Sequence, residues 1–505
     1  MNFPNSNRRA FLQRSALGAG ALGLGELSFI SHLPALNAED LSLPKDAVSL
    51  RPDIEPLTRL IEETARETLL EKVAEQIKAG TSYQDILSAL MLAGVRNIQP
   101  RPVGFKFHAV LVVHSAHLAS IQSPSHERWL PIFWALDYFK DSQARDIREG
   151  NWTMKALDES KIPSTLDITS SFRAAMDEWN EEATDFATAG LVRSAGAGQV
   201  FDLFAEYGCR DYRDIGHKAI FVANSWRTLQ VIGWRHAEPI LRSLAYALLQ
   251  HNGTNPGHAN HPADRAGRQN QEKLSLFRKG WQRGRIDDKA TLDFAEQLRH
   301  GSDLDASDMA LELINANIDP QSIWDAVFNF SGELLGRHPG IVSLHAITTS
   351  NALHYAYQHC QKEMTRKKLL LQACSFMPLF RGDTLNQQEH RFDQIQPETI
   401  PNNQTEALES IFSTLDTSKQ SAAAKVFQYL EQGHSPEQLM NTARRYLFLK
   451  GSNSHDYKFA SAVLEDFYHV SPSWRHHYLA ASVFHLKGSK SKTNSLVERT
   501  RTALS

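Results

Sequence analysis

The chain of 505 residues has 42% hydrophobic and 22% charged side chains and a formal net charge of −3. Such a chain can bury a large core, in one big domain or two, and its composition suggests neither disorder nor a nucleic-acid partner. Its three cysteines form no CxxC pair, which argues against a disulfide framework and against a cysteine-based zinc or iron–sulfur site. The 22 histidines are the unusual feature, because many stand among apolar residues rather than in one tract.

The N-terminal residues match a twin-arginine (Tat) export signal. Asn7-Arg8-Arg9-Ala10-Phe11-Leu12 is followed by a weakly apolar run from Ala16 to Ile30, and small residues near Ala35–Ala38 offer a cleavage region. We therefore expect residues 1–38 to engage the Tat export machinery and to direct the mature protein to the periplasm or the extracellular space. The run is too short and glycine-rich to predict stable membrane insertion. Export in the folded state, which is usual for this route, suits a cofactor loaded in the cytoplasm.

Apolar residues recur at helical spacing along most of the remaining chain, after a polar linker at residues 39–55. Helices are expected near residues 56–93, 107–118, 126–141, 170–182, 184–191, 216–224, 234–249, 285–336, 344–352, 367–380, 405–415, 418–432, 436–449, 454–462 and 474–486. The Gly-, Pro-, Asn- and His-rich stretch from His251 to Arg268 predicts a loop, for instance a lid. Few alternating β-branched runs exist, so we predict an all-α fold: a multi-helix domain over 56–487 and a basic, solvated tail over 488–505.

Four segments place a histidine at or near the start of an apolar run that also carries small residues. They are Phe107-His108-Ala109-Val110-Leu111, Gly216-His217-Lys218-Ala219-Ile220, Leu344-His345-Ala346-Ile347-Thr348 and Ser454-His455-Asp456-Tyr457-Lys458. Neutral imidazole is a good ligand for iron, zinc or copper, and a helical bundle can aim ligands from several helices inward. His455 and Lys458 are three residues apart and share a helix face. The pattern predicts a metal site between core helices.

The plainer interpretation of each residue is structural. A single histidine on an apolar helix is ordinarily a hydrogen-bonded core residue, and we keep that interpretation, with a supporting role beside a metal as the alternative, for His114, His117, His236, His354 and His359. A lysine on such a helix ordinarily extends its ammonium group to solvent. His251, His258 and His261 are expected in the loop. The shared position at the head of similar runs is what separates the four candidate ligands from the rest.

The four segments resemble the histidine segments of the questin oxidase-like family, over roughly residues 100–470 and through short, dispersed motifs. The resemblance implies a largely helical fold and an enzyme that oxidatively opens anthraquinone-type polyketides. Members have been described as NADPH-dependent Baeyer–Villiger oxygenases, others as non-haem iron dioxygenases with four histidines and a carboxylated lysine. Carried over to this chain, the resemblance places iron on His108, His217, His345 and His455, with Lys458 as the carboxylated lysine. Such a lysine supplies the negative charge that a carboxylate gives in 2-His-1-carboxylate iron sites.

Other features of the chain bear on this expectation. The match to the GxGxxG dinucleotide motif at Gly18–Gly23 follows no strand and lies in the export signal, so it is rejected. Without a usable dinucleotide motif, a tightly bound nicotinamide or flavin is not expected, and NADPH is kept as a possible cosubstrate. Lys218 directly after His217, the export signal and the long segment between His251 and Arg285 depart from the family. Substrate is therefore the least transferable property.

We expect an exported non-haem iron oxygenase that oxidises an aromatic or polycyclic small molecule with O2. Aromatic residues near the first site could wall a pocket for a flat substrate or fill the core: Trp129, Phe133, Trp134, Tyr138 and Trp226. Two other classes stay open, a helical scaffold or binding protein with a degenerate site and a zinc-dependent hydrolase. A helical repeat protein is disfavoured because the segments do not recur at a fixed period.

Overall fold

The computed structural model describes residues 43–250, 262–382, 390–451 and 453–505. The predicted export signal, the rejected GxGxxG motif and residues 251–261 of the predicted loop lie outside the described residues. The all-α prediction is confirmed. The described chain is built from helices, and its strand-like pairings are two isolated bridges, Ala47 with Lys155 and Arg285 with Ile318.

The helices of the first half are α3 (Glu55–Glu63), α4 (Arg66–Lys78), α5 (Tyr83–Asn97), α6 (His108–Leu111), α7 (Val113–Gln122), α8 (Leu130–Glu149), α9 (Ile168–Asp177), α10 (Glu181–Ser194), α11 (Ala197–Gly208), α12 (His217–Ile232) and α13 (Ala237–Leu248). The helices of the second half are α14 (Pro262–Lys273), α15 (Asp288–His300), α16 (Asp303–Asn315), α17 (Pro320–Arg337), α18 (Ile341–His359), α19 (Glu363–Arg381), α20 (Gln404–Thr414), α21 (Lys419–Glu431), α22 (Pro436–Lys450), α23 (Ser454–His469), α24 (Pro472–Ala481) and α25 (Ser495–Leu504).

Polar caps fix many of these helix starts. Ser82, Asn180 and Asp287 each accept a hydrogen bond from a backbone amide in the first turn of the helix that follows. Asn453 goes further and forms a capping box with Asp456 at the start of α23. Such caps satisfy amides that have no partner within the helix, and they define the residue at which the helix begins. For α23, the cap sets the position of His455.

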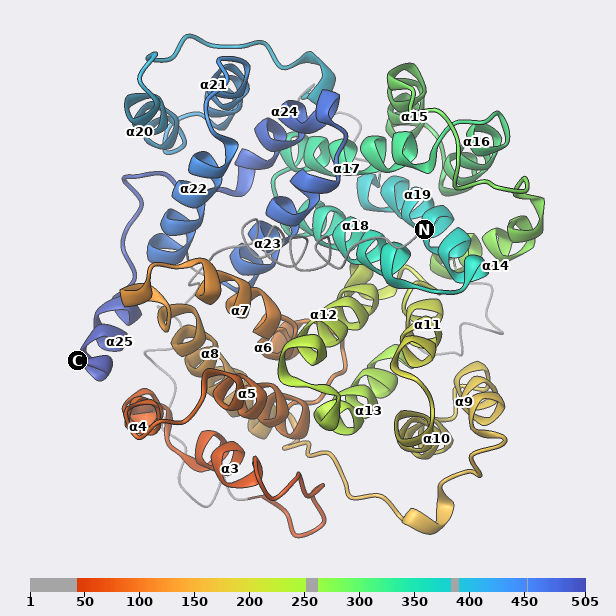
Figure 1. Ribbon diagram of the computed structural model, residues 1–505, viewed down its shortest axis with the longest axis vertical. Helices are drawn as coiled ribbons and strands as arrows, with labels where there is room; N and C mark the ends of the chain where they lie inside the picture. The colour runs from red at the N-terminus through yellow and green to blue at the C-terminus, as the bar shows by residue number, and fades with distance from the viewer. Residues whose placement is uncertain (1–42, 251–261, 383–389, 452) are drawn as a thin grey trace, which may run out of the picture.

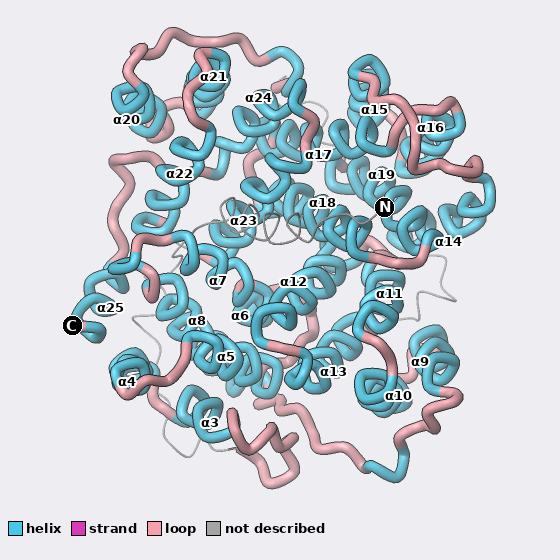
Figure 2. The backbone as a smooth tube through the Cα atoms, viewed as in Figure 1, coloured by secondary structure: helices cyan, strands magenta, loops and turns pink. Residues whose placement is uncertain are grey.

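Four helical segments form a closed ring at the centre of the molecule (Figure 1). In order around the ring they are α6 with α7, α12, α18 and α23, and each contacts the next, with α23 returning to α7. The remaining helices surround this ring: α5, α8 and α13 on one side, and α17 and α19 on the side of α18 (Figure 2). The four histidine segments of the sequence are therefore brought together in the core, although they are far apart along the chain.

Three boundary predictions differ from the structure. The solvated tail is wrong for residues 495–504, because these form α25, which buries Leu496 and Val497 and contacts α4 and α8. Within the predicted linker, backbone hydrogen bonds join residues 46 and 48 to residues 154–156. The predicted loop is wrong for residues 262–268, which belong to α14, where a buried ion pair joins Asp264 to Arg213. In each case a tertiary contact orders a stretch whose local composition is polar.

Within the described ranges, no helix combines the length and the apolar character needed to cross a bilayer.

The first histidine segment was expected as one helix, but the backbone breaks at Val112, so that α6 holds His108 and α7 holds His114 and His117. His108 therefore belongs to a different helix from His114 and His117.

Candidate metal centre

Each of the four candidate histidines lies at the start of its helix. His108 is the first residue of α6, His217 the first of α12, His455 the second of α23 and His345 the fifth of α18. The N-terminal ends of four helices therefore converge on one point. A helix N-terminus carries a partial positive charge, so four of them disfavour a protonated imidazole there and favour an anionic ligand.

The backbone before His108 and before His217 is held in the left-handed region. Phe105 has φ 46°, and Asp214 and Ile215 have φ 56° and 45°, values that non-glycine residues rarely adopt. Gly216, at φ 80°, meets Thr349 of α18 so closely that a Cβ atom would overlap that side chain. Strain of this kind persists where the surrounding structure imposes it, and it is frequent at functional sites. Here it delivers a backbone carbonyl to each imidazole.

Those carbonyls orient three of the rings. The distance from Nδ1 to the carbonyl oxygen is 2.8 Å for His108 and Phe105, 2.5 Å for His217 and Asp214, and 2.6 Å for His345 and Ile341. A carbonyl oxygen only accepts, so each Nδ1 must donate and carry the ring proton. In the neutral ring, the lone pair is then on Nε2. Binding of Nδ1–H to an acceptor is the usual way in which a protein orients a metal-binding histidine.

His455 is oriented by the cap of its own helix. Its Nδ1 lies 3.1 Å from Oδ1 of Asn453, which also accepts the backbone amide of His455 at 2.9 Å. Its Nε2 is buried, and among the described residues it has no hydrogen-bond partner. A buried polar atom without a partner costs free energy and needs an explanation, of which an ion is one.

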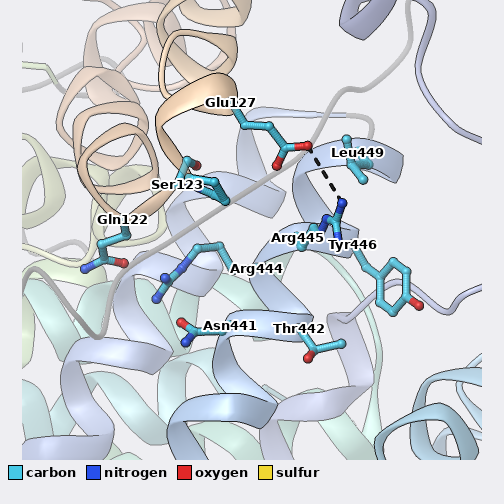
Figure 3. A pocket seen from close by; sticks show the side chains of 10 residues that line it. Gln122, Ser123, Glu127, Asn441, Thr442, Arg444, Arg445, Tyr446 and Leu449 are labelled. Atoms are coloured by element: carbon cyan, nitrogen blue, oxygen red, sulfur yellow. Dashed lines mark ion pairs between the residues drawn. The ribbon is translucent and has the colours of Figure 1, made fainter. Parts of the chain in front are cut away.

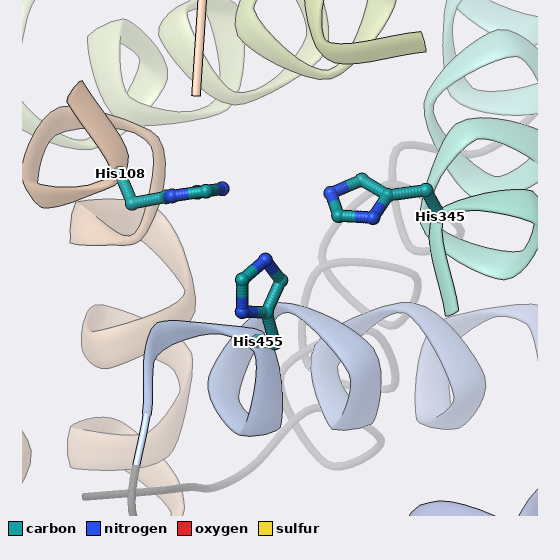
Figure 4. Close-up of side chains that lie close together, drawn as sticks. All are labelled: His108, His345 and His455. Atoms are coloured by element: carbon teal, nitrogen blue, oxygen red, sulfur yellow. The ribbon is translucent and has the colours of Figure 1, made fainter. Parts of the chain in front are cut away.

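The Nε2 atoms converge. Figure 4 shows His108, His345 and His455 directed at a common point, and ligand nitrogens of these three rings all lie within 4.8 Å of one another. His217 adjoins this group on one side, since its Nε2 is 2.9 Å from Nε2 of both His108 and His345, but it is not among the nitrogens that lie within 4.8 Å of His455. We call these four residues the histidine layer.

The histidine layer is electrostatically incomplete without a cation. Burial lowers the pKa of His108, His217 and His345 well below the usual value, and that of His455 to about 3, so all four rings are neutral at pH 7. Neutral rings that donate from Nδ1 present lone pairs to one another at Nε2, and lone pairs 2.9 Å apart repel. A metal ion at the point of convergence would turn this repulsion into ligation. The donor set therefore fits a metal.

The spacing also bears on the coordination geometry. With metal–nitrogen bonds of about 2.1 Å, neighbouring ligands lie about 3.0 Å apart at right angles and about 3.4 Å apart in a tetrahedron. The two Nε2 distances of 2.9 Å match the right-angled arrangement.

Lys458 lies beside this layer. It is 3% exposed, it follows His455 by one helical turn on the same face, and its Nζ is 3.4 Å from Nε2 of His345. Burial lowers the pKa of Lys458 to about 7, so a large fraction of its side chain is the neutral amine at physiological pH. The expectation of a solvent-directed lysine is therefore wrong for this residue, because its amine is in the core.

All five predicted site residues are thus brought together; of the five histidines interpreted as structural, His114 lies in the cavity beneath them, and the other four lie elsewhere. His117 contacts the Tyr83 hydroxyl at 3.1 Å, and the His354 ring packs edge-on against Trp324. Nδ1 of His359 contacts the Tyr355 carbonyl, and Nε2 of His236 contacts Arg235. Lys218, which departs from the family pattern, points away from the cluster and forms a buried ion pair with Asp211.

Sequence reasoning missed a second set of buried polar residues on three of the four helical segments. Asn224 and Arg227 of α12, Asn351 of α18 and Glu465 of α23 lie about two to three helical turns beyond the ligands of their own helices. We call these four residues the polar layer. Together with Lys458 and His114 they line a narrow cavity beneath the histidine layer. Asn224, which follows His217 by seven residues and so shares its helix face, was a signal that could have revealed part of this set.

A separate cleft of about 550 Å³ opens between the end of α7 and α22 (Figure 3). It is lined by Gln122, Ser123, Pro124, Glu127, Asn441, Thr442, Arg444, Arg445, Tyr446 and Leu449. None of these residues belongs to the histidine layer or the polar layer, and the carboxylate of Glu127 is 4.0 Å from Arg445 and 3.4 Å from Arg501. The cleft is therefore distinct from the candidate metal centre.

Comparisons of the chain with protein-family models, with curated proteins and with solved structures find no match.

Proposed function

We propose that this chain is an exported non-haem iron oxygenase of the questin oxidase-like type, which oxidises an aromatic or polycyclic substrate with O2. The observation that supports it most is the convergence of His108, His345 and His455, with His217 beside two of them, each on a ring whose Nδ1 faces an acceptor and next to a buried lysine. Iron bound there would supply O2 activation. Imidazole ligands suit iron and zinc alike, so the resemblance to the questin oxidase-like family is what favours iron.

Lys458 would complete the ligand set as a carbamate. The neutral amine attacks CO2, an N–C bond forms, and the nitrogen loses a proton to give an anionic carboxylate on the side chain. The lowered pKa supplies the neutral amine, and the four helix N-termini stabilise the resulting negative charge. The charge on the product would balance that of the metal, as the carboxylate does in 2-His-1-carboxylate sites.

Apolar side chains lie next to two of the ligands and are exposed. Phe105 and Ile341, whose carbonyls orient His108 and His345, expose 64% and 59% of their own surface. Trp134 and Tyr138 stack on each other at 5.1 Å, and the Tyr138 hydroxyl is 3.4 Å from Ser454, next to His455. Of the five predicted aromatic residues, Tyr138 is thus tied to the ligand-bearing helix α23, whereas Trp226 stacks on Phe201 in the core.

The first test is metal analysis of protein purified without chelators, with and without supplied Fe(II). A His217→Ala/His345→Ala variant removes two ligands, and His354→Ala is the matched control, because His354 is also buried but lies outside the histidine layer. We expect about one iron per wild-type chain and per control chain, and none in the double variant. Zinc in place of iron after loading with either metal would favour the hydrolase, and no metal at all would favour the scaffold.

Activity then separates oxygenase from hydrolase. Iron-loaded wild type should consume O2 in the presence of an anthraquinone-type or similar polycyclic phenol, and the double variant should not. Oxygen uptake measured with and without NADPH decides whether a nicotinamide cosubstrate is required. Export is tested separately, by comparing the periplasmic and cytoplasmic amounts of the wild type with those of an Arg8→Lys/Arg9→Lys variant, which should remain in the cytoplasm.

A further inference from the structure

One hydrogen-bonded network joins all four ligand-bearing segments just below the histidine layer. Arg227 of α12 is its hub: the guanidinium donates to Oδ1 of Asn224 at 3.2 Å, to Oδ1 of Asn351 at 3.1 Å and to the Glu465 carboxylate. Asn351 of α18 donates to Glu465 at 2.7 Å and to Asp466 at 2.9 Å, both on α23. Asn224 donates to the carbonyl of Leu111 at 2.8 Å, which brings in α6.

The network is nearly complete in itself. Both polar ends of Asn224 and of Asn351 have partners, and both terminal nitrogens of Arg227 donate. The guanidinium also lies 4.0 Å from the centre of the Tyr355 ring. Only a planar, forked donor reaches acceptors on three helices at once, which a lysine ammonium at the same place would not do.

A buried ion pair is weak evidence for stability by itself, because the cost of removing both charges from water offsets their attraction. What such a pair can do is fix the relative position of the elements that it joins. Here the elements are the segments that carry the histidine layer and Lys458. On α12, α18 and α23, the residues of the polar layer follow the ligands by about two to three turns. A shift of one helix along another would break the network and separate the Nε2 atoms.

We propose that Arg227, with Asn351 and Glu465, is the positioning device of the metal centre: it holds the four ligand-bearing segments in the register that metal binding requires. The proposal rests on the proposed metal site, and it assigns to these residues a role in metal affinity and geometry rather than contact with substrate. Residues that orient metal ligands typically change metal affinity by 10- to 100-fold when they are replaced, which sets the expected size of the effect.

The decisive variant is Arg227→Met/Glu465→Leu, which replaces the ion pair by apolar groups of similar size and leaves no unpaired charge. The control is Arg299→Met/Glu333→Leu, which removes a buried ion pair between α15 and α17, outside the ring; because Asp393 and Arg337 also lose a partner there, it disturbs its surroundings at least as much. Arg227→Lys is the milder variant, because it keeps the charge and loses the fork. All are compared with wild type by chelator competition for Co(II) and Fe(II), and by the visible spectrum of the Co(II)-loaded protein.

We expect the Arg227→Met/Glu465→Leu variant to bind metal at least 10-fold more weakly than wild type and to show an altered Co(II) spectrum, with Arg227→Lys shifted in the same direction. The Arg299→Met/Glu333→Leu control should stay within about twofold of wild type. Equal affinity and equal spectra in the two double variants would overturn the proposal. If the Arg227→Met/Glu465→Leu variant does not fold, Arg227→Lys decides, and wild-type affinity in it contradicts the role. Failure of the wild type itself to bind metal would instead refute the proposed function.

Discussion

The two layers of the central ring are built from the same helices and are both buried, yet they differ in how their polar groups are satisfied. In the polar layer, the side-chain donors and acceptors of the asparagines and the guanidinium meet one another. In the histidine layer, three Nε2 lone pairs face each other and that of His455 has no partner among the described residues. A buried polar cluster that satisfies itself needs no further partner, whereas an incomplete one does, and an ion is a partner that this donor set could accept.

Removing one partner of the ion pair in the polar layer should have the largest effect on stability. Glu465→Leu leaves the Arg227 charge buried and without its carboxylate, which should lower the free energy of unfolding by about 3–5 kcal/mol. Adding Arg227→Met should recover most of that loss, because no unpaired charge then remains. Urea unfolding of wild type, the two single variants and the double variant measures the coupling. Additive losses would show that the two side chains do not act as a pair.

In the histidine layer, loss of one side chain should affect metal affinity much more than stability. His455→Leu removes an imidazole whose Nε2 has no hydrogen-bond partner, so the metal-free protein should keep its stability within about 1 kcal/mol. Metal affinity should fall by at least about 100-fold, because a ligand is lost. Thermal unfolding with and without metal checks both outcomes. A large loss of stability in the metal-free variant would mean that His455 is a structural residue after all.

The strained backbone before His217 should affect metal binding at the histidine layer. Gly216→Ala places a Cβ atom at φ 80° against Thr349, and it should destabilise the fold by about 1–3 kcal/mol while weakening metal binding. Gly80→Ala is the control, since Gly80 has a similar φ of 97° but open space around it and lies far from the ring. Chelator competition is measured on both variants. Both place an alanine in a left-handed backbone, but only Gly216→Ala should release metal more readily than wild type.

The last prediction concerns pH. Because the folded pKa of His455 is lowered to about 3, this residue stabilises the fold fully above the unfolded value of about 6.5, and the contribution is lost as the pH falls through the folded value. In metal-free protein between pH 6 and pH 4, the stability of the wild type should therefore fall more steeply than that of His455→Leu, by about 1.4 kcal/mol per pH unit.

Asp466, which borders the polar layer, should act in the opposite direction. Burial raises its pKa well above the usual value, so its contribution to stability increases as the pH falls. The difference between wild type and His455→Leu isolates the histidine, because Asp466 is present in both proteins. Equal slopes in the pH series would show that His455 is protonated in the folded state and able to reach solvent.

Much of this arrangement could be predicted from the sequence. Helical periodicity determined the fold class, and the repeated combination of a histidine at the head of an apolar run selected His108, His217, His345 and His455 from the 22 histidines. The spacing of His455 and Lys458 placed both on one face of α23. These are local properties, since the period of a helix and the identity of a residue at its start are decided within a few residues.

The tertiary structure decided the rest, because contacts between distant segments are not encoded in any local period. Only the packed ring shows that the four Nε2 atoms meet, that Arg227 joins helices far apart in sequence, and that Lys218 turns to Asp211 rather than to the site. The same holds for α14 and α25, whose polar composition predicted a loop and a solvated tail. Each is ordered by neighbours, Arg213 for α14 and the helices α4 and α8 for α25, that the local sequence does not contain.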